Sequence, residues 1–217
     1  MFRNRMEAGS KLSEKLSAYR SEHPLVIALP RGGVPVAKEI AASLGAPMDV
    51  LVVRKLGVPA RPELGMGAVA EDGAVYLDRR TLDLADLSEN EVGREVRDAE
   101  ADVVRRAALY RHGRPRLPVQ GRTVILVDDG IATGGTIRAA LNALSRAGAG
   151  KVVLASPVIA SGVASALRPL VAEIVCLEDR PRLGTINRAY RDFRSLRDAD
   201  VVALLDALPP GGQGARA

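Results

Sequence analysis

The sequence predicts an α/β protein built on a doubly wound, five-stranded parallel sheet with helices on both faces. Short, continuous apolar runs alternate with amphipathic segments, and this alternation is typical of parallel βαβ units. The runs lack the polar–apolar alternation of half-exposed strands, so we expect each strand to be buried on both faces. The predicted strands span residues 25–29, 49–56, 122–129, 151–158 and 172–177.

The segments between these strands predict the covering helices. Apolar residues recur at near-helical spacing over residues 6–20. A second helix over 34–44 is expected to end at Gly45, because glycine suits the left-handed conformation that commonly follows a helix. Ser161 is expected to cap a short helix. The other predicted helices span 134–147 and about 197–207.

An insertion of about 57–115 separates the second and third predicted strands. Its first part, up to Gly67, is rich in glycine and proline without apolar periodicity, so we expect a mobile loop. Asp72-Gly73 lies between two β-prone runs and predicts a hairpin over 67–78.

A long amphipathic helix over 88–112 completes the insertion. Ser88 and Glu91 have the spacing of a capping box, in which each residue bonds the other's backbone N–H. The apolar side of this helix is a candidate interface for a homodimer. That side carries Val92, Val96 and Val103.

We expect residues 1–208 to form a single domain. The stretch 178–194 is charged and irregular, and the glycine- and proline-rich tail 209–217 is predicted to be disordered.

Composition narrows the classes of function. The chain has 217 residues and a net charge of +5, with the charges dispersed and aromatic residues at 3%, which does not favour a nucleic-acid-binding platform. No apolar run reaches the ~18 residues that span a bilayer, and the first residues lack the apolar core of a secretory signal. The single cysteine, Cys176, excludes a disulfide framework and indicates a cytoplasmic protein.

The clearest chemical motif is VILVDDGIATGGT, from Val124 to Thr136. Four apolar residues run into Asp128 and Asp129, and unpaired charge is costly inside a strand, so both acids must lie where the strand ends. A Thr-Gly-Gly-Thr segment then opens a helix, whose free backbone N–H groups attract an anion. A phosphorylated sugar fits, with its phosphate in the Thr/Gly loop and its hydroxyls on the acids. The spacing matches neither a Walker A nor a G-x-G-x-x-G motif.

This motif resembles the PRPP-binding motif of the phosphoribosyltransferase family, where PRPP is 5-phosphoribosyl-1-pyrophosphate. LPRGGVPVA (29–37) is similar to the family's pyrophosphate loop, and VVRKLG (52–57) to the segment that leads into its flexible catalytic loop. PELGMGAVAEDG (62–73) and YRDFRSLRDADVV resemble a bacterial subgroup of the family. The resemblance covers nearly the whole chain up to about residue 207 and implies a type I phosphoribosyltransferase fold.

The resemblance also implies roles for individual residues. Asp128 and Asp129 would hold the ribose hydroxyls, while Arg54 and Lys55 would lie near the pyrophosphate and the ribose. Arg61, or another basic residue of the loop, would reach the leaving group when the loop closes. The 5′-phosphate would be held by Ala132, Thr133, Gly134, Gly135 and Thr136, and the pyrophosphate by Arg31, Gly32 and Gly33.

The function expected from this family is transfer of phosphoribose from PRPP to a nitrogenous acceptor, with release of pyrophosphate. The expected cofactor is Mg²⁺, held mainly by substrate and water, with Asp128 and Asp129 as candidate protein ligands. Residues 178–194, with the N-terminal region, would form the hood over the acceptor. This hood lacks an obvious aromatic residue to cover a base, so the acceptor stays open.

Two other functions remain open on the sequence. Some proteins of this fold are non-catalytic regulators that sense nucleotides and bind nucleic acid, and the basic charge balance allows this. A hydrolase acting on a phosphorylated sugar, with Asp128 or Asp129 as general base, is a weaker alternative because no dedicated nucleophile is visible. Family resemblance favours a homodimer.

Overall fold

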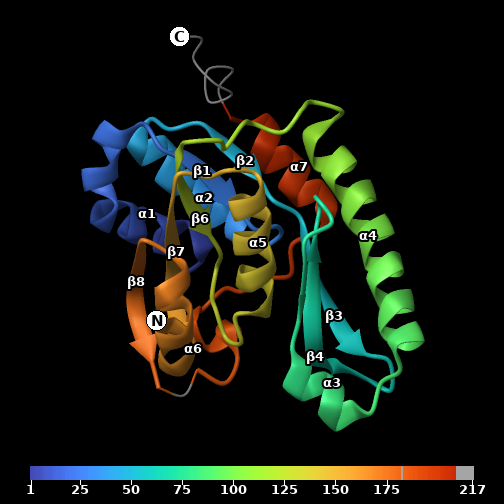
Figure 1. Cartoon of the computed structure of the whole chain (residues 1–217). Coiled ribbons are helices and arrows are strands. Elements are labelled where there is room, and N and C mark those ends of the chain that lie inside the picture. Colours follow the sequence, from blue (N-terminus) through green and yellow to red (C-terminus); the bar gives the residue numbers. More distant parts are fainter. Residues whose placement is uncertain (182, 209–217) are drawn as a thin grey trace.

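The computed structural model describes residues 1–181 and 183–208 (Figure 1). The predicted disordered tail, 209–217, lies outside the described residues, as does Arg182 within the hood. In the part of the chain that the structure describes, no helix is long and apolar enough to cross a membrane.

Five parallel strands form the central sheet in the order β2-β1-β6-β7-β8. The predicted fold class is therefore confirmed. The strand order reverses between β1 and β6, which is the type of position where doubly wound sheets bind ligands. The strands are β1 (Leu25–Ala28), β2 (Met48–Val50), β6 (Thr123–Val127), β7 (Lys151–Ala160) and β8 (Glu173–Arg180).

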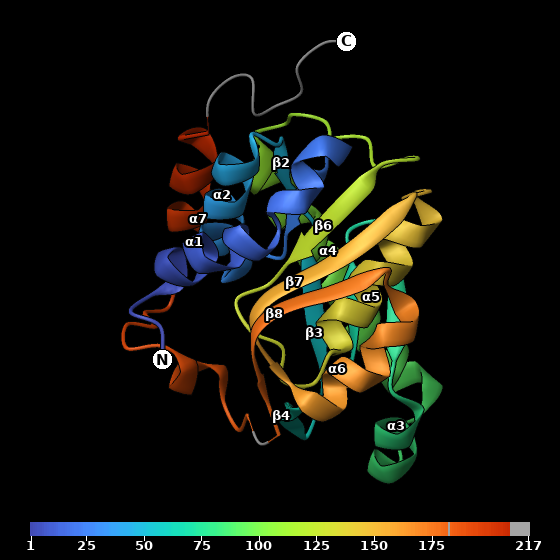
Figure 2. The same cartoon turned by 90° about the vertical axis from the view of Figure 1, so that its left-hand side faces the viewer.

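Helices cover both faces of this sheet (Figures 1 and 2). Helices α1, α2 and α7 lie on one face and α5 and α6 on the other. Within β1, Val26 and Ala28 belong to the first core and Leu25 and Ile27 to the second, as the alternation of strand side chains requires. The helices are α1 (Arg5–Lys15), α2 (Gly33–Leu44), α5 (Gly135–Arg146), α6 (Ser161–Leu167) and α7 (Asp198–Asp206).

Two local predictions differ from the structure. The helix predicted over 6–20 is α1 followed by a 3₁₀ segment, Ser17–Glu22, a tightening that is common at helix ends. Ser161 does not cap α6 but is its first residue, and Ala160 takes the cap position without a side-chain bond. The Ser161 hydroxyl instead donates to the carboxylate of Asp179 on the neighbouring β8. Gly45 ends α2 in the left-handed conformation, as predicted.

The strand predicted over 49–56 and the mobile loop predicted over 57–67 are both wrong. Leu51 and Val52 separate β2 from a second, antiparallel sheet. The sequence shows no strand alternation here, because glycines take the place of side chains where two backbones approach closely. A Cβ atom on Gly67, for example, would lie 2.2 Å from the Tyr76 carbonyl oxygen. The second sheet consists of β3 (Val53–Val58), β4 (Arg61–Ala70) and β5 (Val75–Leu77).

The hairpin predicted around Asp72-Gly73 is confirmed as the turn between β4 and β5. Two helices follow it, α3 (Arg79–Ala85) and the long α4 (Glu89–Arg111). Ser88 and Glu91 form the predicted capping box at the start of α4. The apolar side of α4 packs on β3 and β4 of its own chain, and Val103 is only 1% exposed. Val103, and in part Val96, are therefore used within the chain, whereas Val92 is only half-buried.

The hood, residues 178–194, continues from β8 through a 3₁₀ turn at Ile186–Ala189. It packs against the start of the chain, where Phe2 pairs with Tyr190 in a parallel bridge. The rings of Tyr190 and Phe193 stack with their centroids 5.0 Å apart. The N-terminal region and the hood thus form one structural unit beside the carboxyl end of the sheet.

Candidate functional site

A pocket of about 210 Å³ lies where β1 and β6 end, at the reversal of the strand order. In this class of sheet, ligands bind in the crevice beyond such strand ends. Most of the residues predicted from the sequence line this one pocket. They are Arg31, Gly32, Lys55, Asp128, Asp129, Ala132, Thr133, Gly134 and Thr136.

The loop after β1 approaches the two acids closely. The Pro30–Arg31 peptide bond is cis. A Cβ atom on Gly32 would lie 2.0 Å from Asp129 Oδ2, so only glycine fits there. The Arg31 guanidinium lies 3.8 Å from the Asp198 carboxylate at the start of α7.

Gly33, which is also predicted to bind the pyrophosphate, lies at the start of α2. It is not among the residues that line the pocket. A Cβ atom on Gly33 would lie 2.6 Å from the carbonyl oxygen of Val127. The glycine therefore lets the first turn of α2 pack directly on the end of β6.

Asp128 and Asp129 lie side by side in different environments. Asp129 is 7% exposed, and its Oδ2 accepts a hydrogen bond from Arg5 Nε at 2.7 Å. Asp128 Oδ1 accepts from the backbone N–H of Asp129 at 2.9 Å, and no ion pair joins Asp128 to a cation among the described residues. Burial, together with the negative charge of Asp129, raises the pKa of Asp128 well above its usual value, although Lys55 acts in the opposite direction.

The segment after the two acids leaves polar groups without partners. Gly134 is at the cap position of α5 with φ of 77°, and no side chain of residues 1–181 or 183–208 caps the helix. The first backbone N–H groups of α5 are therefore available at the positive end of the helix dipole. Thr136 Oγ1 is buried and has no hydrogen-bond partner in the described part of the chain. Gly135 begins the helix without lining the pocket.

Alternation along β3 decides which of the two predicted basic residues reaches the pocket. Lys55 lines it, whereas Arg54 points to the opposite face of the strand. There Arg54 Nη1 lies 2.7 Å from Asp102 Oδ2 on α4. Arg61 is exposed at the start of β4 and also lies outside the pocket lining.

Sequence reasoning did not single out Arg5, Val53 or Ile186. Arg5 reaches Asp129 across 124 positions of sequence, a contact that no local pattern announces. Val53 lies on the same side of β3 as Lys55, so strand alternation could have found it. Ile186 covers Gly130, where a Cβ atom would lie 2.4 Å from Ile186 Cγ2, and it supplies an apolar wall from the hood.

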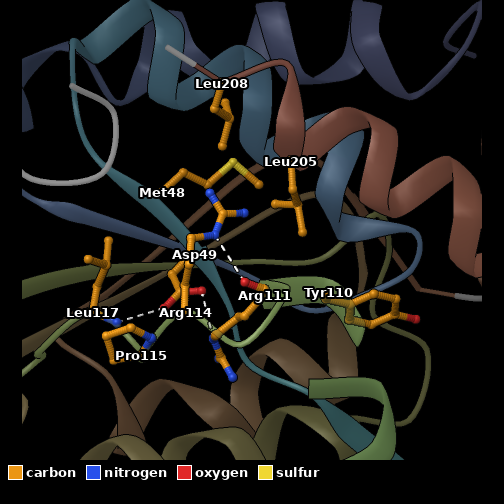
Figure 3. A pocket seen from close by; sticks show the side chains of 9 residues that line it. All are labelled: Met48, Asp49, Tyr110, Arg111, Arg114, Pro115, Leu117, Leu205 and Leu208. Atoms are coloured by element: carbon orange, nitrogen blue, oxygen red, sulfur yellow. Dashed lines mark hydrogen bonds and ion pairs between the residues drawn. The ribbon is translucent and has the colours of Figure 1, made fainter. Parts of the chain in front are cut away.

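A second pocket, also of about 210 Å³, lies beside the edge strand β2 between the ends of α4 and α7 (Figure 3). Asp49 Oδ1 accepts from Arg111 Nε at 3.1 Å, and Asp49 Oδ2 accepts from the Leu117 backbone N–H at 2.8 Å. Arg111 Nη2 also donates to Glu71 at 2.8 Å. None of the predicted site residues lines this pocket.

Strand order, the glycine-containing loop after β1 and the start of α5 define a doubly wound α/β protein with a pocket at its switch point. The Phosphoribosyl transferase domain family matches residues 3–180. The chain belongs to the phosphoribosyl transferase family, and the resemblance noted in the sequence is confirmed.

Individual relatives agree with this assignment. A protein of Mycobacterium tuberculosis strain H37Rv, named "Putative phosphoribosyl transferase", is 42% identical over 206 residues. The match covers 95% of this chain and 46% of the relative, so the chain spans about half the length of that protein. The crystal structure of TT1426 from Thermus thermophilus is 38% identical, with a TM-score of 0.79 over 94% of this chain and 97% of that one.

Proposed function

We propose that this chain transfers the phosphoribosyl group of PRPP to a nitrogenous acceptor and releases pyrophosphate. The observation that carries the proposal is a single pocket in which the unpartnered Thr136 hydroxyl and the uncapped start of α5 lie together with the Asp128 carboxylate. A phosphate satisfies the first two groups and a sugar hydroxyl satisfies the third.

Each part of PRPP has a counterpart in the pocket. The loop over 132–136 is proposed to hold the 5′-phosphate, and Asp128 to accept hydrogen bonds from the ribose hydroxyls. Arg31 and Lys55 provide positive charge near the pyrophosphate, and Gly32 lines the same part of the pocket.

The donor set fits a Mg²⁺ ion that arrives with the substrate. Over residues 1–181 and 183–208, no group of three or more His, Cys, Asp or Glu side chains is placed to hold a metal. Mg²⁺ often binds through one or two carboxylates together with substrate phosphates and water, and Asp128 would be that carboxylate here, because Asp129 is already paired with Arg5. When bound, Mg²⁺ supplies neutralisation of the pyrophosphate charge.

The chain's own residues would act on both sides of the breaking bond. As the anomeric carbon separates from the pyrophosphate oxygen, negative charge builds on the leaving group, which Arg31 and Lys55 would stabilise. Asp128 would hold the ribose while the acceptor nitrogen forms the new bond from the opposite face. Ile186 and Val53 provide apolar walls that limit access of water.

The test is calorimetric titration of the protein with PRPP, with and without Mg²⁺. We expect saturation at one PRPP per chain, and an affinity about tenfold to a hundredfold weaker for Asp128→Asn, because the amide lacks the negative charge that strengthens the hydrogen bonds to the ribose hydroxyls and attracts Mg²⁺. The exposed Asp83 on α3 provides the matched control, and Asp83→Asn should bind as the native protein does. No binding by the native protein would refute the proposal.

A further inference from the structure

Arg5, at the start of α1, contacts the hood and the substrate pocket at the same time. Its Nε lies 2.7 Å from Asp129 Oδ2, and its Nη1 donates to the Arg194 backbone carbonyl at 3.0 Å. The guanidinium carbon lies 3.8 Å from the centroid of the Phe193 ring. The Arg5 side chain is only 11% exposed, and its bond to Asp129 is partly buried, whereas its bond to the Arg194 carbonyl lies at the surface.

The backbone of Asp129 is also fastened to the hood. The Tyr190 hydroxyl donates to the Asp129 carbonyl oxygen at 2.6 Å. The Asp129 Oδ2 that bonds Arg5 also occupies the space that a side chain on Gly32 would need. Asp129 is therefore held by the N-terminal helix, by the hood and by the loop after β1.

We propose that Arg5 is a positioning residue that fixes Asp129 and thereby joins the hood to the loop that receives the substrate. The two adjacent acids then have separate roles. Asp128 faces the ribose, whereas Asp129 connects the hood, which would hold the acceptor, to the loop after β1, which would hold PRPP. This inference deepens the proposed function and rests on it for the identity of the substrate.

The ion pair with Arg5 offsets the cost of burying the charged Asp129 carboxylate. Loss of Arg5 would leave a buried carboxylate unpaired next to Asp128, and breaking one half of a buried pair costs far more than losing a surface pair. Lysine could restore the charge but neither the two-sided hydrogen bonding nor the stacking on Phe193. Arg5→Lys should therefore rescue the defect only in part.

The first test is PRPP titration in the presence of Mg²⁺. We expect Arg5→Ala to bind roughly tenfold more weakly than the native protein, with Arg5→Lys between them. Arg3→Ala is the matched control, because the Arg3 side chain is 75% exposed and pairs with Glu7 at the surface. In the double variant Arg5→Ala/Asp129→Asn the charge that Arg5 neutralised is also removed, so it should bind better than Arg5→Ala alone. Unchanged affinity in Arg5→Ala, or simple additivity in the double variant, would overturn the proposal.

The second test needs no substrate. Hydrogen exchange of the ligand-free protein should become faster in Arg5→Ala over both 128–134 and 190–194, and should be unchanged in Arg3→Ala. If Arg5→Ala does not fold, Phe193→Leu should produce a smaller change in the same direction. Exchange that stays native in either segment would refute the coupling. Hydrogen exchange does not depend on PRPP. If the native protein failed to bind PRPP, the proposed function would be refuted, and the exchange rates would still test the role of Arg5.

Discussion

The pocket at Asp128 and the pocket at Asp49 have the same volume, about 210 Å³, and each has a carboxylate in its wall. At Asp49 both carboxylate oxygens accept from protein donors, Arg111 and the backbone of Leu117. At Asp128 the carboxylate has no cationic partner in the described part of the chain, and the hydroxyl of Thr136 is unpaired nearby. Buried polar groups are usually satisfied by protein partners, so the unpaired groups at Asp128 support the proposal that this pocket, and not the one at Asp49, binds the substrate.

The hydrogen-bond network in the Asp49 pocket connects the two sheets of the molecule. Arg111 joins β2, through Asp49, to the turn after β4, through Glu71, and it also donates to the carbonyl oxygen of Val50. These bonds fasten the second sheet to the central one. Lys55 on β3 of this second sheet lines the pocket at Asp128, so the network at Asp49 joins the two sheets that form that pocket.

The largest expected effect is on the free energy of unfolding, from a substitution in the Asp49 pocket. Arg111→Met leaves Asp49 and Glu71 buried without their shared partner, so the free energy of unfolding should fall by about 3–5 kcal/mol. Urea unfolding followed by circular dichroism measures this change.

Arg114 provides the control, because it lines the same pocket but pairs with Asp206 at 3.7 Å on the surface. Arg114→Met should change the free energy of unfolding by less than about 1 kcal/mol. Equal losses in the two variants would show that the Asp49 network carries no special stability.

A smaller effect of opposite sign is expected at Asp128. The pKa of Asp128 is raised in the folded state, so folding favours the protonated carboxyl. The stability that Asp128 contributes is therefore fully present below the ordinary carboxyl pKa and is lost as the pH rises through the folded-state pKa. Asparagine does not titrate, so Asp128→Asn avoids this loss of stability at higher pH. Its side-chain oxygen still accepts from the Asp129 backbone N–H. The ligand-free variant should be more stable than the native protein at neutral pH by on the order of 1 kcal/mol.

Urea unfolding at several pH values between about 4 and 8 measures this difference, which should grow with pH. Asp49→Asn should behave in the opposite way, since it breaks the ion pair with Arg111 and destabilises the fold. A native Asp128 that proves as stabilising as Asp49 would remove the distinction between the two pockets.

Most of the central sheet, and the position of the two acids at a strand end, can be predicted from the sequence for the same physical reason. Continuous apolar strands are recognisable because burial on both faces leaves no room for polar residues, and acids at their ends stand out against that background. The insertion was harder, because glycines at positions such as 57 and 67 erase the alternation that marks a strand. Arg54 was placed at the site as half of a basic pair, although a strand turns neighbouring side chains to opposite faces.

Arg5 could not be predicted at all. Its role depends on a contact with Asp129 and on the fold of the hood, both far away in sequence. The same is true of Arg111, whose partners come from β2 and from the turn after β4. Patterns within a segment reveal what the segment forms, whereas the partners of a buried charge depend on tertiary packing.

The smallest effect compares two hydroxyls, one without and one with a protein partner. Thr136→Val removes an Oγ1 that has no partner in the described residues, so ligand-free stability should stay equal or rise by up to about 1 kcal/mol. PRPP binding should weaken about tenfold, because the hydroxyl is proposed to donate to the phosphate. Ser156→Ala removes a buried hydroxyl that donates to the Val158 carbonyl at 3.0 Å, and should cost about 1 kcal/mol of stability without affecting PRPP binding. If Thr136→Val lost stability as Ser156→Ala does and bound PRPP normally, the unpaired hydroxyl would not mark a ligand site.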